Sequence, residues 1–206
     1  MQIMETNLKF NSGLRKRSST KRAIIHHSAS ADVSAATIHQ WHLNQGWSGI
    51  GYQFVIRANG AIERGRPEWA IGSHSGPKGN GDSIGIVLAG NFEIDKPTEA
   101  QMASLAWLIK EYLEPKYGEL KILGHKDVMA TACPGAMFPW AKLNEMLKGE
   151  VKTMVEKWKT DIIKNAAQEG LIDANMGHQP DEPASKWFVL AVCLNLLKKT
   201  ERRKIR

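Results

Sequence analysis

The sequence predicts an α/β fold with a central mixed β-sheet flanked by helices, followed by a small C-terminal helical pair. Along residues 21–148, apolar segments typical of strands alternate with segments whose apolar residues recur at helical spacing. Two amphipathic segments then follow near residues 150–169 and 184–199, separated by a stretch rich in turn-forming residues. These observations predict the sheet with its helices and, after it, the helical pair.

Strand patterns occur in four segments of the body. They are residues 22–28, 51–65, 83–92 and 120–125. The second segment contains two strand patterns around Asn59-Gly60, a dipeptide typical of tight hairpin turns. The third, SIGIVLAGNF, is a continuous apolar run, which indicates a strand in the centre of the sheet. The fourth is short, and its end carries His125.

Helical patterns occur in two segments of the body. Residues 34–46 carry apolar residues at helical spacing and end at Gly46, a residue type that often follows the last helical turn. A second helix is expected from residue 98 to about residue 117. It opens with the sequence TEAQ, in which Thr98 and Gln101 can form a reciprocal capping box.

Composition is that of a globular protein without membrane spans. Hydrophobic residues make up 42% of the 206 residues and charged residues 24%. No apolar run approaches the roughly 18 residues that a bilayer span needs. No apolar signal-peptide core is visible near the N-terminus, so we expect synthesis in the cytoplasm. Cys133 and Cys193 are the only cysteines, which argues against a disulfide scaffold.

The net charge of +7 is concentrated at the two ends of the chain. Residues 1–22 and residues 196–206 each carry six Lys or Arg residues against one Glu. Such ends suit a polyanion, namely an anionic wall polymer, an anionic membrane surface or nucleic acid, although they can equally serve only solubility. We therefore divide the chain into a basic N-terminal extension (1–20), an α/β body (21–148) and a helical C-terminal region (150–206).

Histidine and cysteine residues near the expected strand ends are candidate metal ligands. His125 ends a strand and Cys133 follows on the next loop, so they can approach a metal from one side. A third ligand can come from the pair His26-His27, of which only one can face the site, because successive strand residues point to opposite faces. Alone, this spacing is weak evidence. Whether Cys133 is a ligand, a nucleophile or a packed thiol stays open at this point.

Other candidate residues have plainer interpretations. His39 and His42 share a helix face but lack a carboxylate or cysteine at ligand spacing, which favours a structural or surface role. Tyr52, at the start of a strand, is compatible with ordinary packing. His74 lies on a Gly-rich loop, and this loop lacks the GxxxxGK[ST] order of a phosphate-binding loop, so we exclude nucleotide binding.

Six motifs occur along the body in a particular order and spacing. They are IIHHSAS, IHQWHLNQGWSGIGYQFVI, GAIERGRP, AIGSHSG, DSIGIVLAGNF and GHKDVMATACPG. As a set they resemble the zinc-dependent N-acetylmuramoyl-L-alanine amidases, the type-2 amidases, a family that includes phage endolysins and the peptidoglycan recognition proteins. The resemblance covers about residues 21–148 and implies the type-2 amidase fold for that body.

The resemblance also implies a set of site residues. It implies one zinc ion (Zn2+) per chain, with the ligands His26, His125 and Cys133. Tyr52 matches the family's catalytic tyrosine. Thr131 stands where some phage members have lysine and catalytic recognition proteins have threonine, which makes it a second catalytic candidate. His74 falls in the family's groove and is expected to contact substrate rather than metal.

The function implied is hydrolysis of the amide between N-acetylmuramic acid and L-alanine in bacterial peptidoglycan. Zinc-bound water is the expected nucleophile, and Tyr52 and Thr131 are expected to orient it or to stabilise the oxyanion. The protein then resembles a phage or prophage endolysin, which causes cell lysis by acting on the cell wall after release. The alternative is a non-catalytic peptidoglycan-recognition module, but such members commonly replace the cysteine that is present here as Cys133.

Peptidoglycan is the expected partner of the whole chain. The C-terminal region, residues 150–206, resembles helical segments appended to lytic enzymes and is expected to bind the cell wall, with packing or dimerisation as the alternative. The basic ends are expected to contact anionic wall polymers or the membrane surface. No recognised nucleic-acid motif supports a nucleic-acid partner.

Overall fold

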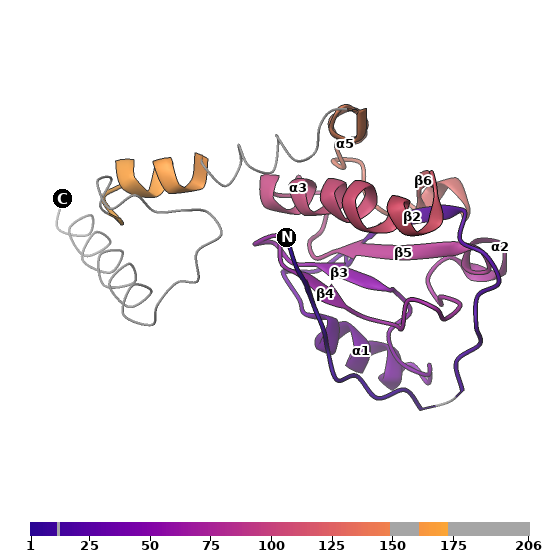
Figure 1. Ribbon diagram of the computed structural model, residues 1–206. Coiled ribbons are helices and arrows are strands. Elements are labelled where there is room, and N and C mark those ends of the chain that lie inside the picture. The colour runs from indigo at the N-terminus through magenta and orange to yellow at the C-terminus, as the bar shows by residue number, and fades with distance from the viewer. Residues whose placement is uncertain (12, 149–160, 173–206) are drawn as a thin grey trace. The chain divides into compact units, whose positions relative to one another are not determined.

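The computed structural model describes residues 1–11, 13–148 and 161–172, and the chain divides into two compact units, Met1–Val151 and Lys152–Arg206 (Figure 1). The first unit contains the sheet and every predicted site residue. No helix within the described residues is long and apolar enough to cross a membrane.

The first unit is built on a mixed six-stranded sheet with the strand order β1-β4-β3-β5-β2-β6. The strands are β1 (Ile3–Met4), β2 (Arg22–His27), β3 (Phe54–Ile56), β4 (Ile62–Arg64), β5 (Ser83–Leu88) and β6 (Lys121–Gly124). The β3–β4 pair is antiparallel and all other neighbouring pairs are parallel. The predicted α/β class and the mixed sheet are confirmed.

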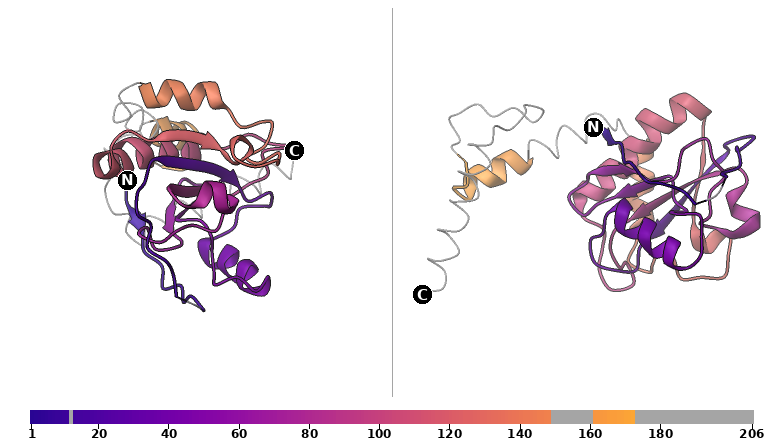
Figure 2. Two further views of the ribbon diagram at one scale, coloured as in Figure 1. Left: turned by 90° about the vertical axis from the view of Figure 1, so that its right-hand side faces the viewer. Right: turned by 90° about the horizontal axis from the view of Figure 1, so that it is seen from below.

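Helices cover both faces of this sheet. They are α1 (Ala35–Asn44), α2 (Gly76–Asn80), α3 (Glu99–Trp107), a π-helical segment (Leu108–Leu113), α4 (Glu114–Tyr117), a 3-10 turn (His125–Asp127) and α5 (Trp140–Lys148). Helix α1 lies on one face, and α3 and α5 lie on the other (Figure 1 and Figure 2).

Local sequence signals explain where several of these elements begin and end. The capping box of Thr98 and Gln101 is present, with both reciprocal hydrogen bonds. The predicted hairpin turn is present too, since Gly60 has a φ of 85° and its N–H donates to the Arg57 carbonyl at 2.8 Å. The helix expected from residue 98 to about residue 117 is helical throughout but passes through the π-helical segment.

The core is centred on β2 and β5, two neighbouring strands in the interior of the sheet. Ile24 and Ile25 of β2 and Ile86 of β5 have no exposed surface. The apolar run in β5 therefore occupies the central position that its composition predicts. His26 is in register with Val87 of β5, whose side chain packs in the cluster that includes α1 residues. Because residues in register on neighbouring strands share a face, His26 lies on the α1 face of the sheet.

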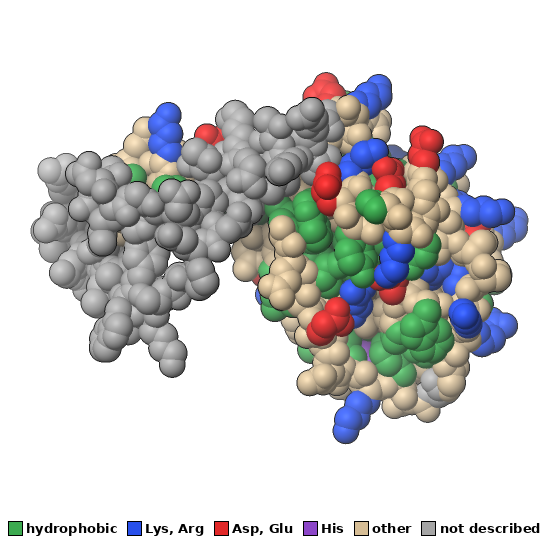
Figure 3. All heavy atoms as spheres, viewed as in Figure 1, with side chains coloured by type: hydrophobic (Ala, Val, Ile, Leu, Met, Phe, Trp, Pro, Cys, Tyr) green, Lys and Arg blue, Asp and Glu red, His purple; other side chains and the backbone are tan. Residues whose placement is uncertain are grey.

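The described residues of the N-terminal segment, 1–11 and 13–20, lie against the body. Strand β1 pairs with β4 at the sheet edge, and Phe10 packs its ring against His39 of α1 with the centroids 5.1 Å apart. Arg17 is 7% exposed, and its guanidinium donates to the backbone carbonyls of Glu68 and Ala70. One of the basic residues at this end is therefore used inside the fold. On the face shown in Figure 3, basic and acidic side chains of the first unit are interspersed around apolar ones.

The second unit is described only over residues 161–172. Residues 161–168 are α-helical, within the first helix expected for the C-terminal pair. The second expected helix, near residues 184–199, and Cys193 lie outside the described residues.

Candidate metal centre

Strand β2 delivers one imidazole to each face of the sheet. His26 is fully buried, and its Nδ1 lies 3.7 Å from the Sγ of Cys133. His27 points to the other face, where its Nδ1 accepts the backbone N–H of Phe92 at 3.0 Å. The alternation of strand side chains therefore separates the two histidines, and His26 is the one that meets Cys133.

His26, His125 and Cys133 converge on one point. Each offers one potential ligand atom, and these atoms all lie within 4.8 Å of one another. No other group of three or more His, Cys, Asp or Glu residues in the described parts of the chain converges in this way. Zn–N and Zn–S bonds of tetrahedral zinc place nitrogen and sulfur about 3.6 Å apart. The 3.7 Å between His26 Nδ1 and Cys133 Sγ matches that spacing.

The loop that carries His125 and Cys133 is tied back on itself. The Asp127 carboxylate accepts the N–H of Gly124 at 2.7 Å, and the Lys126 N–H donates to the Cys133 carbonyl at 2.9 Å. After Cys133, Gly135 has a φ of 106°, and a Cβ there would lie 2.3 Å from the backbone of Phe92. Only glycine permits this approach of the loop to the segment that follows β5.

Burial sets the protonation of these groups. It lowers the pKa of His26 well below its ordinary value, and it also lowers the pKa of His125. Both imidazoles are therefore neutral near pH 7 and have a lone pair for a metal. Burial raises the pKa of the Cys133 thiol to about 11. Without a cation nearby the thiol stays protonated and is a poor nucleophile, which favours the ligand interpretation over the nucleophile.

Tyr52 lies beside the imidazole of His26, with the ring centroids 4.9 Å apart. Burial, followed by the neighbouring Cys133, raises the pKa of its hydroxyl, so the hydroxyl stays protonated and can donate a hydrogen bond. The backbone around it is held by the Arg66 N–H, which donates to the Tyr52 carbonyl at 2.7 Å.

Thr131 lies two residues before Cys133 and is exposed. Its Oγ1 accepts the backbone N–H of Cys133 at 3.3 Å. The structure therefore joins Thr131 to the backbone of the cysteine loop, and its hydroxyl proton stays available for donation.

The remaining histidines of the first unit serve the fold or lie behind the site. His39 and His42 of α1 accept the N–H groups of Ile50 and Gly51 at 3.1 and 3.0 Å, which confirms their structural role. His74, expected at a substrate groove, is only 7% exposed, and its Nδ1 lies 3.0 Å from the Nε2 of His26. Sequence reasoning missed this contact, because no local pattern links residues 48 positions apart.

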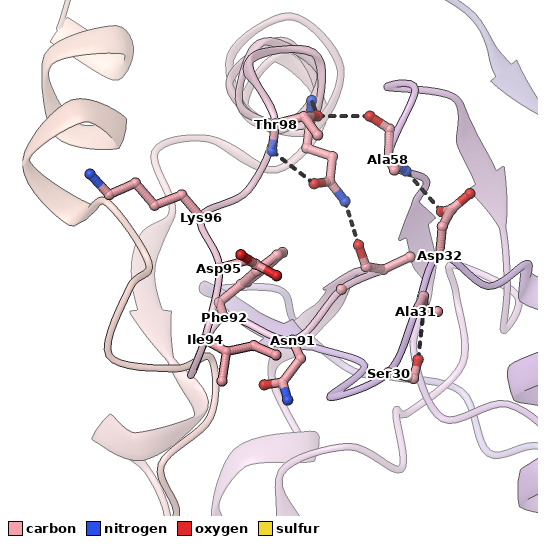
Figure 4. A pocket seen from close by; sticks show the side chains of 13 residues that line it. Ser30, Ala31, Asp32, Ala58, Asn91, Phe92, Ile94, Asp95, Lys96 and Thr98 are labelled. Carbon is pink, nitrogen blue, oxygen red and sulfur yellow. Dashed lines mark hydrogen bonds between the residues drawn. The ribbon is translucent and has the colours of Figure 1, made fainter. Parts of the chain in front are cut away.

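A separate cavity of about 510 Å³ lies near the ends of β2, β3 and β5 (Figure 4). None of the predicted site residues lines it. Three of its polar lining side chains form hydrogen bonds within the protein. Thr98 Oγ1 donates to the Ala58 carbonyl at 2.7 Å, Gln101 Nε2 donates to the Ala89 carbonyl at 2.8 Å, and Asp32 accepts the Ala58 N–H at 2.9 Å. These bonds join α3 and the loop after β2 to the β3–β4 hairpin and to the end of β5, which gives these polar side chains a structural role.

Both the sequence and the fold of this chain are similar to those of known proteins. Residues 16–136 match the family described as N-acetylmuramoyl-L-alanine amidase. The endolysin of Enterobacteria phage K11 is 37% identical over 145 residues, which cover 66% of this chain and 94% of the relative. The peptidoglycan-recognition protein LB of Drosophila melanogaster is 38% identical over 127 residues, covering 54% of this chain and 53% of the relative. Among solved structures, the N-acetylmuramoyl-L-alanine amidase LysC from Clostridium intestinale URNW superimposes with a TM-score of 0.68 at 37% identity and covers 73% of this chain and 99% of its own.

Proposed function

This chain belongs to the N-acetylmuramoyl-L-alanine amidase family, and on that premise we propose that it uses zinc to hydrolyse the amide between N-acetylmuramic acid and L-alanine. It is a peptidoglycan amidase of the phage endolysin type. The observation that carries the zinc proposal is the convergence of His26, His125 and Cys133 on one point, with Tyr52 beside them.

The donor set fits zinc. Two imidazoles and one thiolate leave a fourth tetrahedral position open, as catalytic zinc sites require. Zinc held there would polarise the amide carbonyl and lower the pKa of a water molecule to about 7. Because burial alone keeps the Cys133 thiol protonated at neutral pH, binding of the cation must release that proton.

Tyr52 is the proposed donor to the oxyanion that develops on the scissile carbonyl. Its hydroxyl stays protonated in its buried position, and its ring lies against the ligand His26. A donor held in place before the reaction stabilises developing negative charge without reorganisation. The Tyr52 side chain is also held from the α1 side, where the His42 ring lies 5.7 Å away, centroid to centroid.

Thr131 is the proposed second polar group of the reaction. Its oxygen accepts the Cys133 N–H, so its own proton is free to donate to water or to the oxyanion. This role places a neutral hydroxyl where some phage relatives carry a lysine. We therefore propose a smaller contribution from Thr131 than from Tyr52.

The alternative function is recognition of peptidoglycan without cleavage. This alternative is considered because some relatives of the chain are named peptidoglycan-recognition proteins. The presence of Cys133 and Tyr52 at one site supports the enzyme, because recognition alone needs neither a metal ligand nor a buried proton donor.

The test is the product of the reaction. Full-length protein incubated with purified peptidoglycan is expected to release stem peptides that begin with a free L-alanine amine, identified by mass spectrometry, and to contain one zinc ion per chain. Glycan fragments with intact stem peptides would show a glycosidase and contradict the amidase. Binding of peptidoglycan with no new amine would support the recognition module.

We also propose that residues 150–206 bind the cell wall, and that the chain reaches the wall after synthesis in the cytoplasm and release. Removal of residues 152–206, the second unit, is expected to lower the fraction of protein that sediments with purified walls while turnover of a soluble muropeptide is retained. Equal loss of both would instead indicate that this region stabilises the first unit. Anionic wall polymers remain a proposed contact of the basic ends, and raised salt should weaken that contact.

A further inference from the structure

A row of buried polar side chains lies behind His26, on the side away from Cys133. The Nδ1 of His26 faces the cysteine sulfur at 3.7 Å, whereas its Nε2 faces the Nδ1 of His74 at 3.0 Å. The two rings are nearly perpendicular, with an interplanar angle of 87°. His26 is 0% and His74 7% exposed, so protein groups rather than bulk water surround both rings.

The row continues from His74 to a backbone carbonyl. The Nε2 of His74 lies 3.4 Å from the hydroxyl of Ser83, and Ser83 Oγ donates to the carbonyl of Gly79 at 2.6 Å. The Ser75 hydroxyl lies beside the row, 2.6 Å from His74 Nδ1 and 3.4 Å from His26 Nε2. Ser75 and Ser83 have no exposed surface.

The carbonyl at the end of the row orients the Ser83 hydroxyl, and this orientation favours one direction for the two imidazole contacts that follow. A carbonyl only accepts, so the Ser83 hydroxyl proton points to Gly79 and the Ser83 oxygen is left to accept from His74 Nε2–H. A neutral His74 with its proton on Nε2 has a lone pair on Nδ1. That lone pair accepts from His26 Nε2–H, which leaves the lone pair of His26 on Nδ1.

The resulting tautomer of His26 is the one that a metal site needs. A metal-binding imidazole must present an unprotonated nitrogen to the ion. In this arrangement of hydrogen bonds the unprotonated nitrogen is Nδ1, which faces the Cys133 sulfur at 3.7 Å. Hydrogen bonds within the protein therefore favour this tautomer of His26 even without a bound metal ion.

The fold makes room for the His74 ring with two glycines. A Cβ at Gly72 would lie 2.4 Å from the Cδ2 atom of His74, and a Cβ at Gly85 would lie 2.5 Å from the same atom. Gly85 is in the central strand β5, in register with Ile24 of β2. Glycine weakens a strand interior, so its presence here indicates that close approach of this ring is needed.

We propose that His74 is a positioning residue which, with Ser75 and Ser83, holds His26 in the tautomer and orientation that present Nδ1 to the metal. This inference rests on the proposed function, in which His26 is a zinc ligand. In this proposal His74 contacts the zinc-ligating residue His26, whereas the sequence led us to expect a contact with substrate. Outer partners of this kind set the tautomer of metal-bound histidines.

The central experiment measures zinc affinity of the full-length protein by competition with a chromophoric chelator. In His74→Leu the acceptor is lost, and the affinity is expected to fall about 10- to 100-fold. In His74→Asn the side-chain oxygen can replace Nδ1 as acceptor, and most of the affinity is expected to return. His39→Leu is the matched control: His39 is equally buried, accepts a backbone N–H and lies outside the row, so its loss should leave zinc affinity unchanged.

A second measurement uses no metal. Long-range proton–nitrogen NMR spectra of the metal-free wild-type protein should show His26 with its proton on Nε2, and His74→Leu should lose that preference. A wild-type His26 protonated on Nδ1 would overturn the inference.

The outcomes separate the inference from the proposed function. Wild-type protein that binds no zinc contradicts the proposed function itself. Wild-type protein that binds zinc, with His74→Leu binding it as tightly, overturns only the positioning role. A raised KM at unchanged zinc affinity would show a substrate contact and would also overturn it. If His74→Leu does not fold, Ser83→Ala takes its place, and unchanged zinc affinity in a folded Ser83→Ala protein counts against the inference.

Discussion

The two halves of the candidate metal centre differ in how the fold holds them. His26 belongs to the interior strand β2, is fully buried and has His74 behind it. His125 and Cys133 follow the edge strand β6 on a loop and are partly exposed. On that loop Met129 is 45% exposed, with its sulfur 3.4 Å from His125 Nε2.

This difference in burial suggests different roles for the strand half (His26) and the loop half (His125 and Cys133) of the candidate site. A side chain on a central strand with buried partners has little freedom, so the strand half supplies a fixed geometry. A loop over the surface tolerates change and is reached by solvent, so the loop half is where substrate and metal can enter. The comparison can be tested by substitutions on each side, beginning with the ligands themselves.

The largest effect is expected from removing one ligand from either half. Both Cys133→Ser and His26→Ala should reduce wall lysis to background, because a tetrahedral site cannot hold catalytic zinc with two protein ligands. Turbidity loss of purified walls and zinc content measure the result, with circular dichroism to show that each variant is folded. Retained activity in Cys133→Ser alone would mean that the loop half is dispensable, and retained activity in both would refute the zinc assignment.

The next largest effect is expected at Tyr52, beside the strand half. Tyr52→Phe keeps the ring that packs near His26 and removes the proton donor. We expect kcat on a soluble muropeptide to fall about 10²- to 10³-fold, the usual effect of losing one oxyanion donor, with zinc affinity unchanged. An unchanged kcat would remove Tyr52 from the reaction, and a lost zinc ion would give it a structural role instead.

The burial of His42 on helix α1 predicts that the stability of the protein depends on pH. Burial lowers the pKa of His42 from 6.5 to about 4. The unfolded chain takes up this proton near pH 6.5 and the folded chain only near pH 4. The contribution of neutral His42 to the free energy of unfolding is therefore fully present above about pH 6.5. It is lost as the pH falls toward 4, and this loss lowers the free energy of unfolding by about 3 kcal/mol at most.

The measurement is the free energy of unfolding of metal-free protein in urea between pH 4 and pH 7.5. In His42→Asn the amide oxygen can still accept the Gly51 N–H, and one titrating group is gone. The pH slope of this variant should be shallower than that of the wild type. Identical slopes would show that His42 titrates alike in both states.

The smallest effect is expected at Thr131, on the exposed loop half. Thr131→Val keeps the branched shape and removes one hydroxyl. Loss of about 1.4 kcal/mol, the size of one hydrogen bond, would lower kcat about tenfold. A fall as large as that of Tyr52→Phe would mean that the loop half is as finely organised as the strand half.

Local sequence patterns predict much of the fold because each depends on near neighbours. The Thr98–Gln101 capping box and the Asn59-Gly60 turn are interactions within a few residues, and both are present. Strand β1 carries no such signal, since it is only two residues long and acquires its structure by pairing with β4 about 60 residues away. For the same reason the burial of Arg17 against Glu68 and Ala70 was not expected.

The sequence by itself determined which residue types are available for chemistry and that only one of His26 and His27 can face a given side of the sheet. Strand alternation alone left the choice open and the family resemblance implied His26; the tertiary structure gives the physical reason, because β2 lies between β5 and β6 and turns His26 toward the loop of Cys133. It also placed His74 behind His26, where the sequence alone led us to expect a groove residue on a Gly-rich loop. Side-chain alternation is a property of a single strand, whereas a metal site is formed by residues from several strands and loops. Their positions relative to one another depend on how the whole sheet packs.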